Sequence, residues 1–239
     1  MARGVRRWRL RRSREVVIIR APVFVPTLRD GDLTLRPVRL RDARELEGVL
    51  LAHREWLQPW EASNPQGSGA WNIRAGIKNL LEQARNYQSL PFLLELEGRI
   101  VGQLTVSSML YGAMSSATLG YWVSPDVAGR SLAPTAVALA TDYCFQELGM
   151  HRMEICIRPE NAKSLRVVEK LGFRYEGLRR RYIHIDGDWR DHVCFAVLSE
   201  EVPQGVLARW RQGFADERLA QIREADAALL SEPWRPGGL

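Results

Sequence analysis

The segment Tyr121-Trp122-Val123-Ser124-Pro125-Asp126-Val127-Ala128-Gly129-Arg130-Ser131-Leu132-Ala133 decides the fold. Its apolar start ends a strand predicted over 118–123, its Ser-Pro-Asp favours a turn, and its last residues open a long helix predicted over 131–148. A strand that breaks into a loop at a helix N-terminus leaves backbone N–H groups unpaired at the positive end of the helix dipole. This arrangement favours a bound phosphate, although many such junctions bind nothing.

A second informative segment surrounds the start of the next predicted helix, over 162–171. Asn161 and Ser164 stand three residues apart there, and Gly172 ends the helix. Asn is a good helix cap and Ser is a plausible partner for it. Helix capping alone explains this pair as well as a binding role does.

The remaining apolar spacing predicts a mixed sheet. Antiparallel strands come first, and strand–helix–strand–helix–strand follows, which is typical of an α/β (α+β) fold with helices on both faces of the sheet. The further expected strands are 32–38, the hairpin 92–96 with 100–108, 153–157, 173–175, 181–185 and 193–198. One further helix is expected to begin after Asp42 and another to span 70–88, with a loop over 58–69 between them. Residues 200–232 are expected to be helical and amphipathic.

Composition and charge divide the chain into a domain with extensions. The 239 residues are 46% hydrophobic and 26% charged, as in one globular domain. Residues 1–20 hold eight Arg and one Glu and carry +7, so the remainder of the chain, whose total net charge is +6, carries −1. We expect residues 1–22 to form a disordered basic arm with weak contact to RNA or the ribosome. A solvated tail without a partner explains the same composition.

Membrane spans, disulfide frameworks and metal centres have no support. Apolar runs such as 16–19 are far shorter than the roughly 20 residues that cross a bilayer, so we expect no membrane association and a cytoplasmic protein. Cys144, Cys156 and Cys194 form no C-x-x-C pair, which predicts buried reduced thiols. The His residues show no H-x-x-x-H spacing, so no metal is expected.

Several short segments, taken in order, carry a family resemblance. They are Leu35-Arg36-Pro37, Leu57-Gln58-Pro59-Trp60, Gly120-Tyr121-Trp122-Val123, 128–133, Phe145-Gln146-Glu147-Leu148-Gly149-Met150-His151-Arg152, Pro159-Glu160-Asn161 with Ser164, Glu169-Lys170-Leu171-Gly172-Phe173, Glu176-Gly177 and Asp186-Gly187-Asp188-Trp189-Arg190-Asp191-His192. Over residues 30–200 the chain resembles the GNAT family of N-acetyltransferases, and within it the RimJ/RimL type. The resemblance implies a GNAT domain over 30–200, and a helical C-terminal extension with a Pro/Gly tail over 201–239.

The resemblance also implies a cosubstrate site for acetyl-CoA in a splay between two strands. Its pyrophosphate would lie on backbone N–H groups of Ala128, Gly129, Arg130, Ser131, Leu132 and Ala133. The strand backbone at Trp122 and Val123 would hold the pantetheine arm, with Asn161 and Ser164 near the thiol. The family loop usually has Gln or Arg at the position of Ala128 and Gly at the position of Ser131, where a Cβ could crowd the phosphate or disfavour the backbone angle.

The implied reaction is direct attack of a neutral amine on the thioester. An N-terminal α-amine, with a pKa of about 7.7–8.0, is already partly neutral at pH 7, whereas Lys at about 10.4 is not. Candidate bases are Glu154, Glu95 or a water held by Asn161, and candidate acids for the departing thiolate are Ser164 and Tyr182. Trp60 is expected to line the acceptor groove.

The acceptor expected from the resemblance is the N-terminal α-amine of a protein, typically a ribosomal protein. A small amine such as an aminoglycoside or polyamine is the first alternative. A non-catalytic module that binds CoA or RNA is the second, suggested by the altered loop and the basic arm. The sequence is compatible with a monomer or a homodimer.

Overall fold

The computed structural model describes residues 25–67 and 72–231, which form one mixed sheet covered by helices. The eight strands lie in the order β1-β2-β3-β4-β5-β6-β8-β7, and all neighbours are antiparallel except the parallel pair β5 and β6. Their bounds are β1 Leu28–Asp30, β2 Leu33–Pro37, β3 Leu90–Leu96, β4 Arg99–Leu110, β5 Ser116–Val123, β6 Arg152–Ile157, β7 Arg174–Ile185 and β8 Asp188–Leu198. The predicted mixed α/β fold is therefore confirmed.

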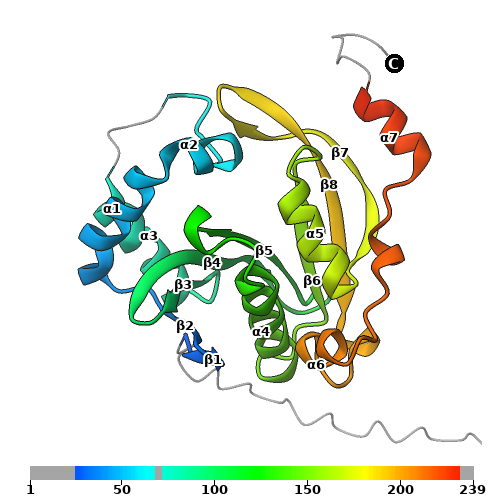
Figure 1. Cartoon of the computed structure of the whole chain (residues 1–239), viewed down its shortest axis with the longest axis horizontal. Coiled ribbons are helices and arrows are strands. Elements are labelled where there is room, and N and C mark those ends of the chain that lie inside the picture. The colour runs from blue at the N-terminus through cyan, green and yellow to red at the C-terminus, as the bar shows by residue number, and fades with distance from the viewer. Residues whose placement is uncertain (1–24, 68–71, 232–239) are drawn as a thin grey trace, which may run out of the picture.

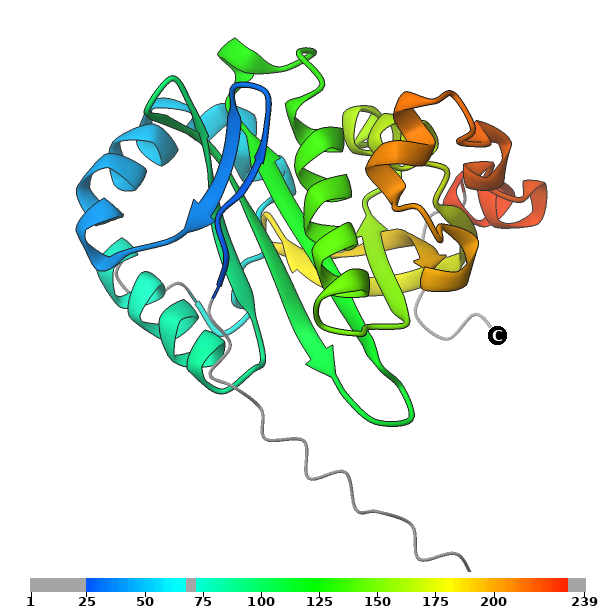
Figure 2. The ribbon, with the colours of Figure 1, turned by 90° about the horizontal axis from the view of Figure 1, so that it is seen from below.

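Helices cover both faces of this sheet (Figures 1 and 2). The helices are α1 Ala43–Ala52, α2 Arg54–Leu57, α3 Ile73–Arg85, α4 Leu132–Gln146, α5 Ala162–Leu171, α6 Val206–Arg211 and α7 Glu224–Ser231. The larger core lies between the sheet and α4 with α5, whereas a smaller one joins α1 and α3 to the opposite face. Phe92 belongs to the first core and its neighbour Leu93 to the second, which explains why β3 is apolar on both faces.

Strands β5 and β6 pair only at their beginnings. Ser116–Thr118 lie opposite Arg152–Glu154, and the ladder stops there. The rest of β5 keeps its antiparallel partner β4 up to Val123, while the rest of β6 keeps β8 up to Ile157. The sheet is thus splayed where both strands end, at the point where the chain leaves β5 for α4 and β6 for α5.

The structure differs from the sequence expectations around the last strands. The two short segments expected at 173–175 and 181–185 are parts of β7, which continues through register shifts at Tyr175/Gly177 and Arg179/Ile183. β8 begins at Asp188 rather than at 193, and the short β1 was not predicted. Bulges hide the two-residue alternation from which strands are predicted.

The segment 200–232 is helical only in short pieces. Besides α6 and α7 it holds the 3-10 turns η4 Ser199–Glu201 and η5 Glu217–Ala220. Positive φ angles of 94° at Gly205 and 74° at Gly213 interrupt the helix. The Asp142 carboxylate of α4 accepts hydrogen bonds from the backbone N–H groups of Val206 and Leu207 and so fixes the start of α6.

Residues 1–22 and 233–239, for which a basic arm and a tail were predicted, lie outside the described residues. No helix within residues 25–67 and 72–231 is long and apolar enough to cross a membrane.

Candidate active site

The connection from β5 to α4 offers unpaired backbone donors. A 3-10 turn, η3 Pro125–Val127, follows the strand, and it uses two of the expected donors internally. The N–H of Ala128 binds the Pro125 carbonyl at 3.2 Å, and that of Arg130 binds the Val127 carbonyl at 3.4 Å. The expectation that every N–H of 128–133 is available is therefore too broad.

Four N–H groups remain at this connection. Among the described residues, the backbone N–H groups of Gly129, Ser131, Leu132 and Ala133 have no hydrogen-bond partner. They lie at the N-terminus of the 15-residue helix α4, where the helix dipole is positive. Donors of this kind fit a dianionic pyrophosphate, which needs several N–H groups from one loop.

Two residues of this loop have a left-handed backbone conformation. Gly129 has φ 86° and Ser131 has φ 60°, both in the left-handed region. Ser131 thus adopts the angle for which glycine is suited, and its side chain makes no cap hydrogen bond. Its carbonyl accepts from the Thr135 hydroxyl at 2.8 Å, which holds the first turn of α4.

We expect the substitution Ser131→Gly to stabilise the protein slightly and to tighten CoA binding. Relief of the left-handed strain raises the free energy of unfolding by roughly 1–2 kcal/mol. The larger conformational entropy of glycine in the unfolded chain lowers it by roughly 0.5–1 kcal/mol. Thermal unfolding and calorimetric titration with CoA measure the two effects. Ser124→Gly is the matched control, because Ser124 has an ordinary φ of −62° and should only lose stability. Weaker CoA binding by Ser131→Gly would show that the serine contributes to the site.

The splay is bridged by a pair of hydroxyl groups. The Ser164 hydroxyl of α5 donates to the Tyr121 phenol oxygen of β5 at 2.9 Å. Burial raises the pKa of Tyr121 above its usual range, so the phenol keeps its proton at any physiological pH. Asn161 caps α5, since its side-chain oxygen accepts from the Ser164 N–H at 3.1 Å. The structure therefore brings Asn161 and Ser164 together and adds Tyr121, which was not among the predicted site residues.

The end of β5 is held by an indole. Trp56 of α2 donates its Nε1–H to the Val123 carbonyl at 3.0 Å, so this acceptor is already used. The Lys163 ammonium lies 3.7 Å from the centroid of the Trp56 ring. Trp122 points to the opposite face of the sheet and packs against the α1 and α3 core. Only its backbone is therefore placed at the splay, and Trp56 is a site residue that spacing along the sequence could not reveal.

The acids expected as bases are ion-paired. Glu154 accepts from Arg152 at 2.9 Å and from Arg179 at 2.8 Å, through different carboxylate oxygens. Glu95 pairs with Arg36 at 2.8 Å.

Tyr182, the other expected acid, is 42% exposed on the edge strand β7. Its ring packs against His192, and the Arg179 guanidinium lies over it. No contact among the described residues joins Tyr182 to Asn161 or Ser164.

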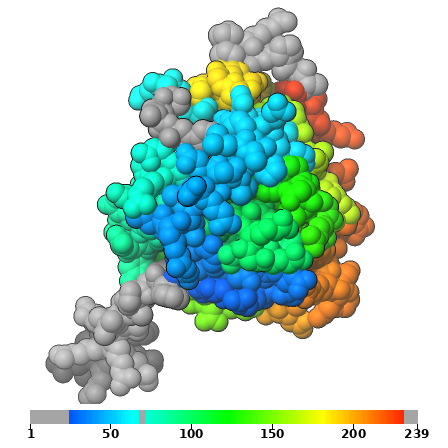
Figure 3. Space-filling view, turned by 60° about the vertical axis from the view of Figure 1, so that its left-hand side comes forward, coloured from blue at the N-terminus to red at the C-terminus, as the bar shows by residue number. Residues whose placement is uncertain are grey.

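The tip of the β7–β8 hairpin meets the segment after α2, as Figure 3 shows for the yellow and cyan surfaces. Ala62 forms a β-bridge with Ile185, and the Gln58 amide donates to Asp186 at 3.0 Å. Trp60 lies in this segment, with the Arg158 guanidinium 5.3 Å from its ring centroid. Arg158 follows the end of β6, so Trp60 is placed beside the mouth of the splay.

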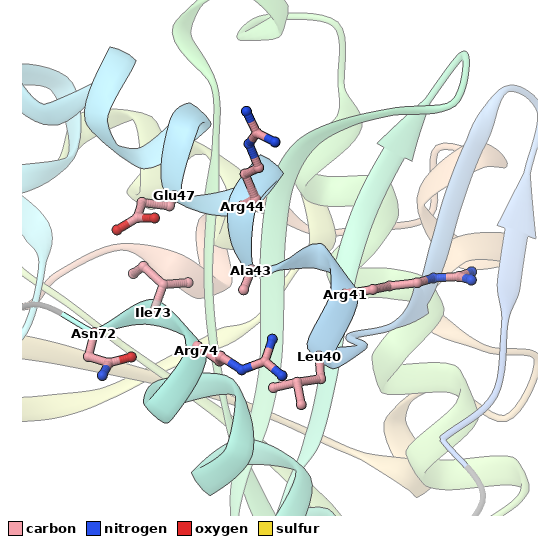
Figure 4. A pocket seen from close by; sticks show the side chains of 8 residues that line it. All are labelled: Leu40, Arg41, Ala43, Arg44, Glu47, Asn72, Ile73 and Arg74. Carbon is pink, nitrogen blue, oxygen red and sulfur yellow. The ribbon is translucent and has the colours of Figure 1, made fainter.

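A cavity lies elsewhere, between α1 and α3. It has a volume of about 320 Å³ and opens between the start of α1 and the start of α3 (Figure 4). Arg44, Glu47 and Arg74 are among the residues that line it. It opens beside α1 and α3, on the sheet face opposite α4 and its free N–H groups, so it is separate from the donor site.

Comparison with known proteins identifies the family. Residues 32–174 match the Acetyltransferase (GNAT) domain. The chain belongs to the GNAT acetyltransferase family. This confirms the expected resemblance, and the splay with the open helix N-terminus fits the GNAT fold.

Relatives of this chain include acetyltransferases with different named acceptors. A solved structure, Mycobacterium smegmatis RimJ in complex with CoA-disulfide, is 37% identical, covers 80% of this chain and 94% of its own, and has a TM-score of 0.72. The Escherichia coli [ribosomal protein uS5]-alanine N-acetyltransferase is 28% identical over 72% of this chain and 91% of its own length. The spermidine N(1)-acetyltransferase of the same organism is 25% identical over 70% of this chain and 86% of its own length.

Proposed function

We propose that this protein transfers the acetyl group of acetyl-CoA to the α-amine at the N-terminus of a ribosomal protein. The observation that carries the proposal is the set of four free N–H groups at the start of α4, beside the splay of β5 and β6. The Escherichia coli relative named for acetylating ribosomal protein uS5 supports the choice of acceptor. Such an acceptor places the enzyme in the cytoplasm, where ribosomes are.

Each part of the site has a role in this reaction. The backbone N–H groups of Gly129, Ser131, Leu132 and Ala133 hold the pyrophosphate, and the splay directs the thioester toward the end of β5. Asn161 orients Ser164 by capping α5. The Ser164 hydroxyl of α5 and the protonated Tyr121 phenol of β5 contact each other beside the splay, and we assign them as proton donors for the departing thiolate.

The amine needs little help from a base. An α-amine with a pKa of about 7.7–8.0 is partly neutral at pH 7, so loss of its proton to water costs little. Both carboxylate oxygens of Glu154 are occupied by arginines, which favours a positioning role for Glu154 over proton abstraction.

The paired charges on the sheet face opposite α4 and α5 favour a peptide acceptor over a polyamine. A polycation binds best to unpaired carboxylates, but Glu154 and Glu176 are paired with Arg152 on this face. Arg179 also binds Glu154, and Arg158 binds Glu160, so these carboxylates are not free for a polycation. The small-amine alternative, which the spermidine relative suggests, is therefore the weaker candidate.

Radiolabelled acetyl-CoA tests the proposal with three acceptors. We expect transfer to a peptide that copies the N-terminus of ribosomal protein uS5, no transfer to the same peptide with a blocked N-terminus and an internal Lys, and transfer to spermidine at least about tenfold slower, as the ratio of neutral amine implies. Preferred acetylation of spermidine would overturn the acceptor. Binding of CoA without transfer to any of the three would support the non-catalytic alternative.

A further inference from the structure

Two cysteines face each other across neighbouring strands on the sheet face opposite α4 and α5. Cys156 of β6 and Cys194 of β8 are register partners, and their sulfur atoms lie 2.8 Å apart. Residues directly opposite in an antiparallel pair have Cα atoms about 4.5–5.5 Å apart, which is within the range that a disulfide spans. Both thiols are free.

The surroundings of this pair favour a reactive thiolate. The Arg179 guanidinium lies 3.5 Å from the Cys156 sulfur, and the Glu154 carboxylate lies 3.4 Å from it. The hydrogen bond between the thiols lowers the pKa of Cys194, with Arg179 acting in the same direction, although Glu154, Glu176 and burial oppose it. The same hydrogen bond and burial raise the pKa of Cys156, so the thiolate of the pair lies on Cys194, and Cys156 becomes the nucleophile when its proton passes to the Cys194 sulfur 2.8 Å away. Cys156 is only half-buried, so an oxidant can reach it.

The cysteine pair is less suited to binding a metal ion than to reacting with an oxidant. Glu154, Cys156 and Cys194 could together offer three ligand atoms. Arg179 already occupies the cationic position, since it binds Glu154 at 2.8 Å and approaches the Cys156 sulfur. A divalent cation would have to displace this guanidinium.

We propose that Cys156 and Cys194 form a redox site that a peroxide converts reversibly into an intramolecular disulfide. The Cys156 thiolate attacks one peroxide oxygen, the O–O bond breaks, and hydroxide leaves to give a sulfenic acid. Cys194 then attacks that sulfur and displaces the hydroxyl, so that one peroxide and two thiols yield one disulfide and two waters. Because the second thiol is already in contact, the sulfenic acid is captured before irreversible oxidation.

Mass spectrometry after hydrogen peroxide treatment tests this site on the full-length protein. We expect loss of two hydrogen atoms, a disulfide that joins the Cys156 and Cys194 peptides, and full recovery with dithiothreitol. Cys144→Ser is the matched control and should behave like the parent, because burial raises the pKa of the Cys144 thiol to about 12 and keeps it unreactive.

Single variants separate the thiol that is oxidised first, Cys156, from the thiol that captures the sulfenic acid, Cys194. In Cys194→Ser we expect Cys156 to gain two oxygen atoms that dithiothreitol does not remove, since no thiol captures the sulfenic acid. In Cys156→Ser we expect no intramolecular disulfide. The proposal is overturned if both thiols stay alkylatable after peroxide in the parent protein, or if an intermolecular disulfide forms instead of the internal one.

Discussion

Replacing Ala133 by proline weakens CoA binding about tenfold or more while the fold is kept. The substitution removes one of the four free N–H groups, and a hydrogen bond to a charged group contributes about 1.5–3 kcal/mol. Proline is tolerated in the first turn of a helix, where its missing N–H leaves no intrahelical bond unmade. The chain already has Pro134 at the next position of α4.

Ala133→Ser is the matched control for this effect, because it changes the side chain and keeps the N–H. Calorimetric titration with CoA measures the affinity of both variants, and thermal unfolding of the free proteins shows whether the fold is kept. A folded Ala133→Pro protein with the affinity of the parent would exclude this N–H as a phosphate donor.

A side chain at position 102 is expected to displace the end of β5. Gly102 of β4 lies opposite Val123, and a Cβ there would stand 2.4 Å from the Trp122 carbonyl oxygen and 3.2 Å from the Val123 Cα. Neither backbone atom can move without distorting the strand next to the splay. We expect Gly102→Ala to lower the free energy of unfolding by about 1–3 kcal/mol, as overpacked sites do, and to weaken CoA binding.

Gly120→Ala provides the comparison on the neighbouring strand. A Cβ at Gly120 meets no atom within 4 Å, so we expect a change within about 0.5 kcal/mol and unchanged CoA binding. Thermal unfolding resolves the difference, since each 1 kcal/mol shifts the midpoint by roughly 2–4 °C in a chain of this size. Equal stability of Gly102→Ala and Gly120→Ala would mean that β4 and β5 separate easily at this end.

The sequence predicts the local features of this site well. The strand that ends at Val123, the turn after it and the helix that begins at Leu132 follow from apolar spacing and turn residues over a short stretch. The Asn161 cap of α5 is equally local, since donor and acceptor are three residues apart.

Features that depend on distant partners were not predictable. The indole of Trp56 reaches the Val123 carbonyl from 67 positions away, and Tyr121 meets Ser164 across 43 positions. Which loop N–H groups stay free depends on η3, a single turn that composition does not fix. The expected base Glu154 is paired with Arg179 only because β7 and β6 both flank β8.

Amide chemical shifts on addition of CoA test the central claim most directly. In an assigned proton–nitrogen NMR spectrum we expect the largest changes at the amides of Gly129, Ser131, Leu132 and Ala133, and smaller ones at Ala128 and Arg130, whose N–H groups are bonded internally. Changes confined to residues around the cavity between α1 and α3, with the start of α4 unaffected, would contradict the account.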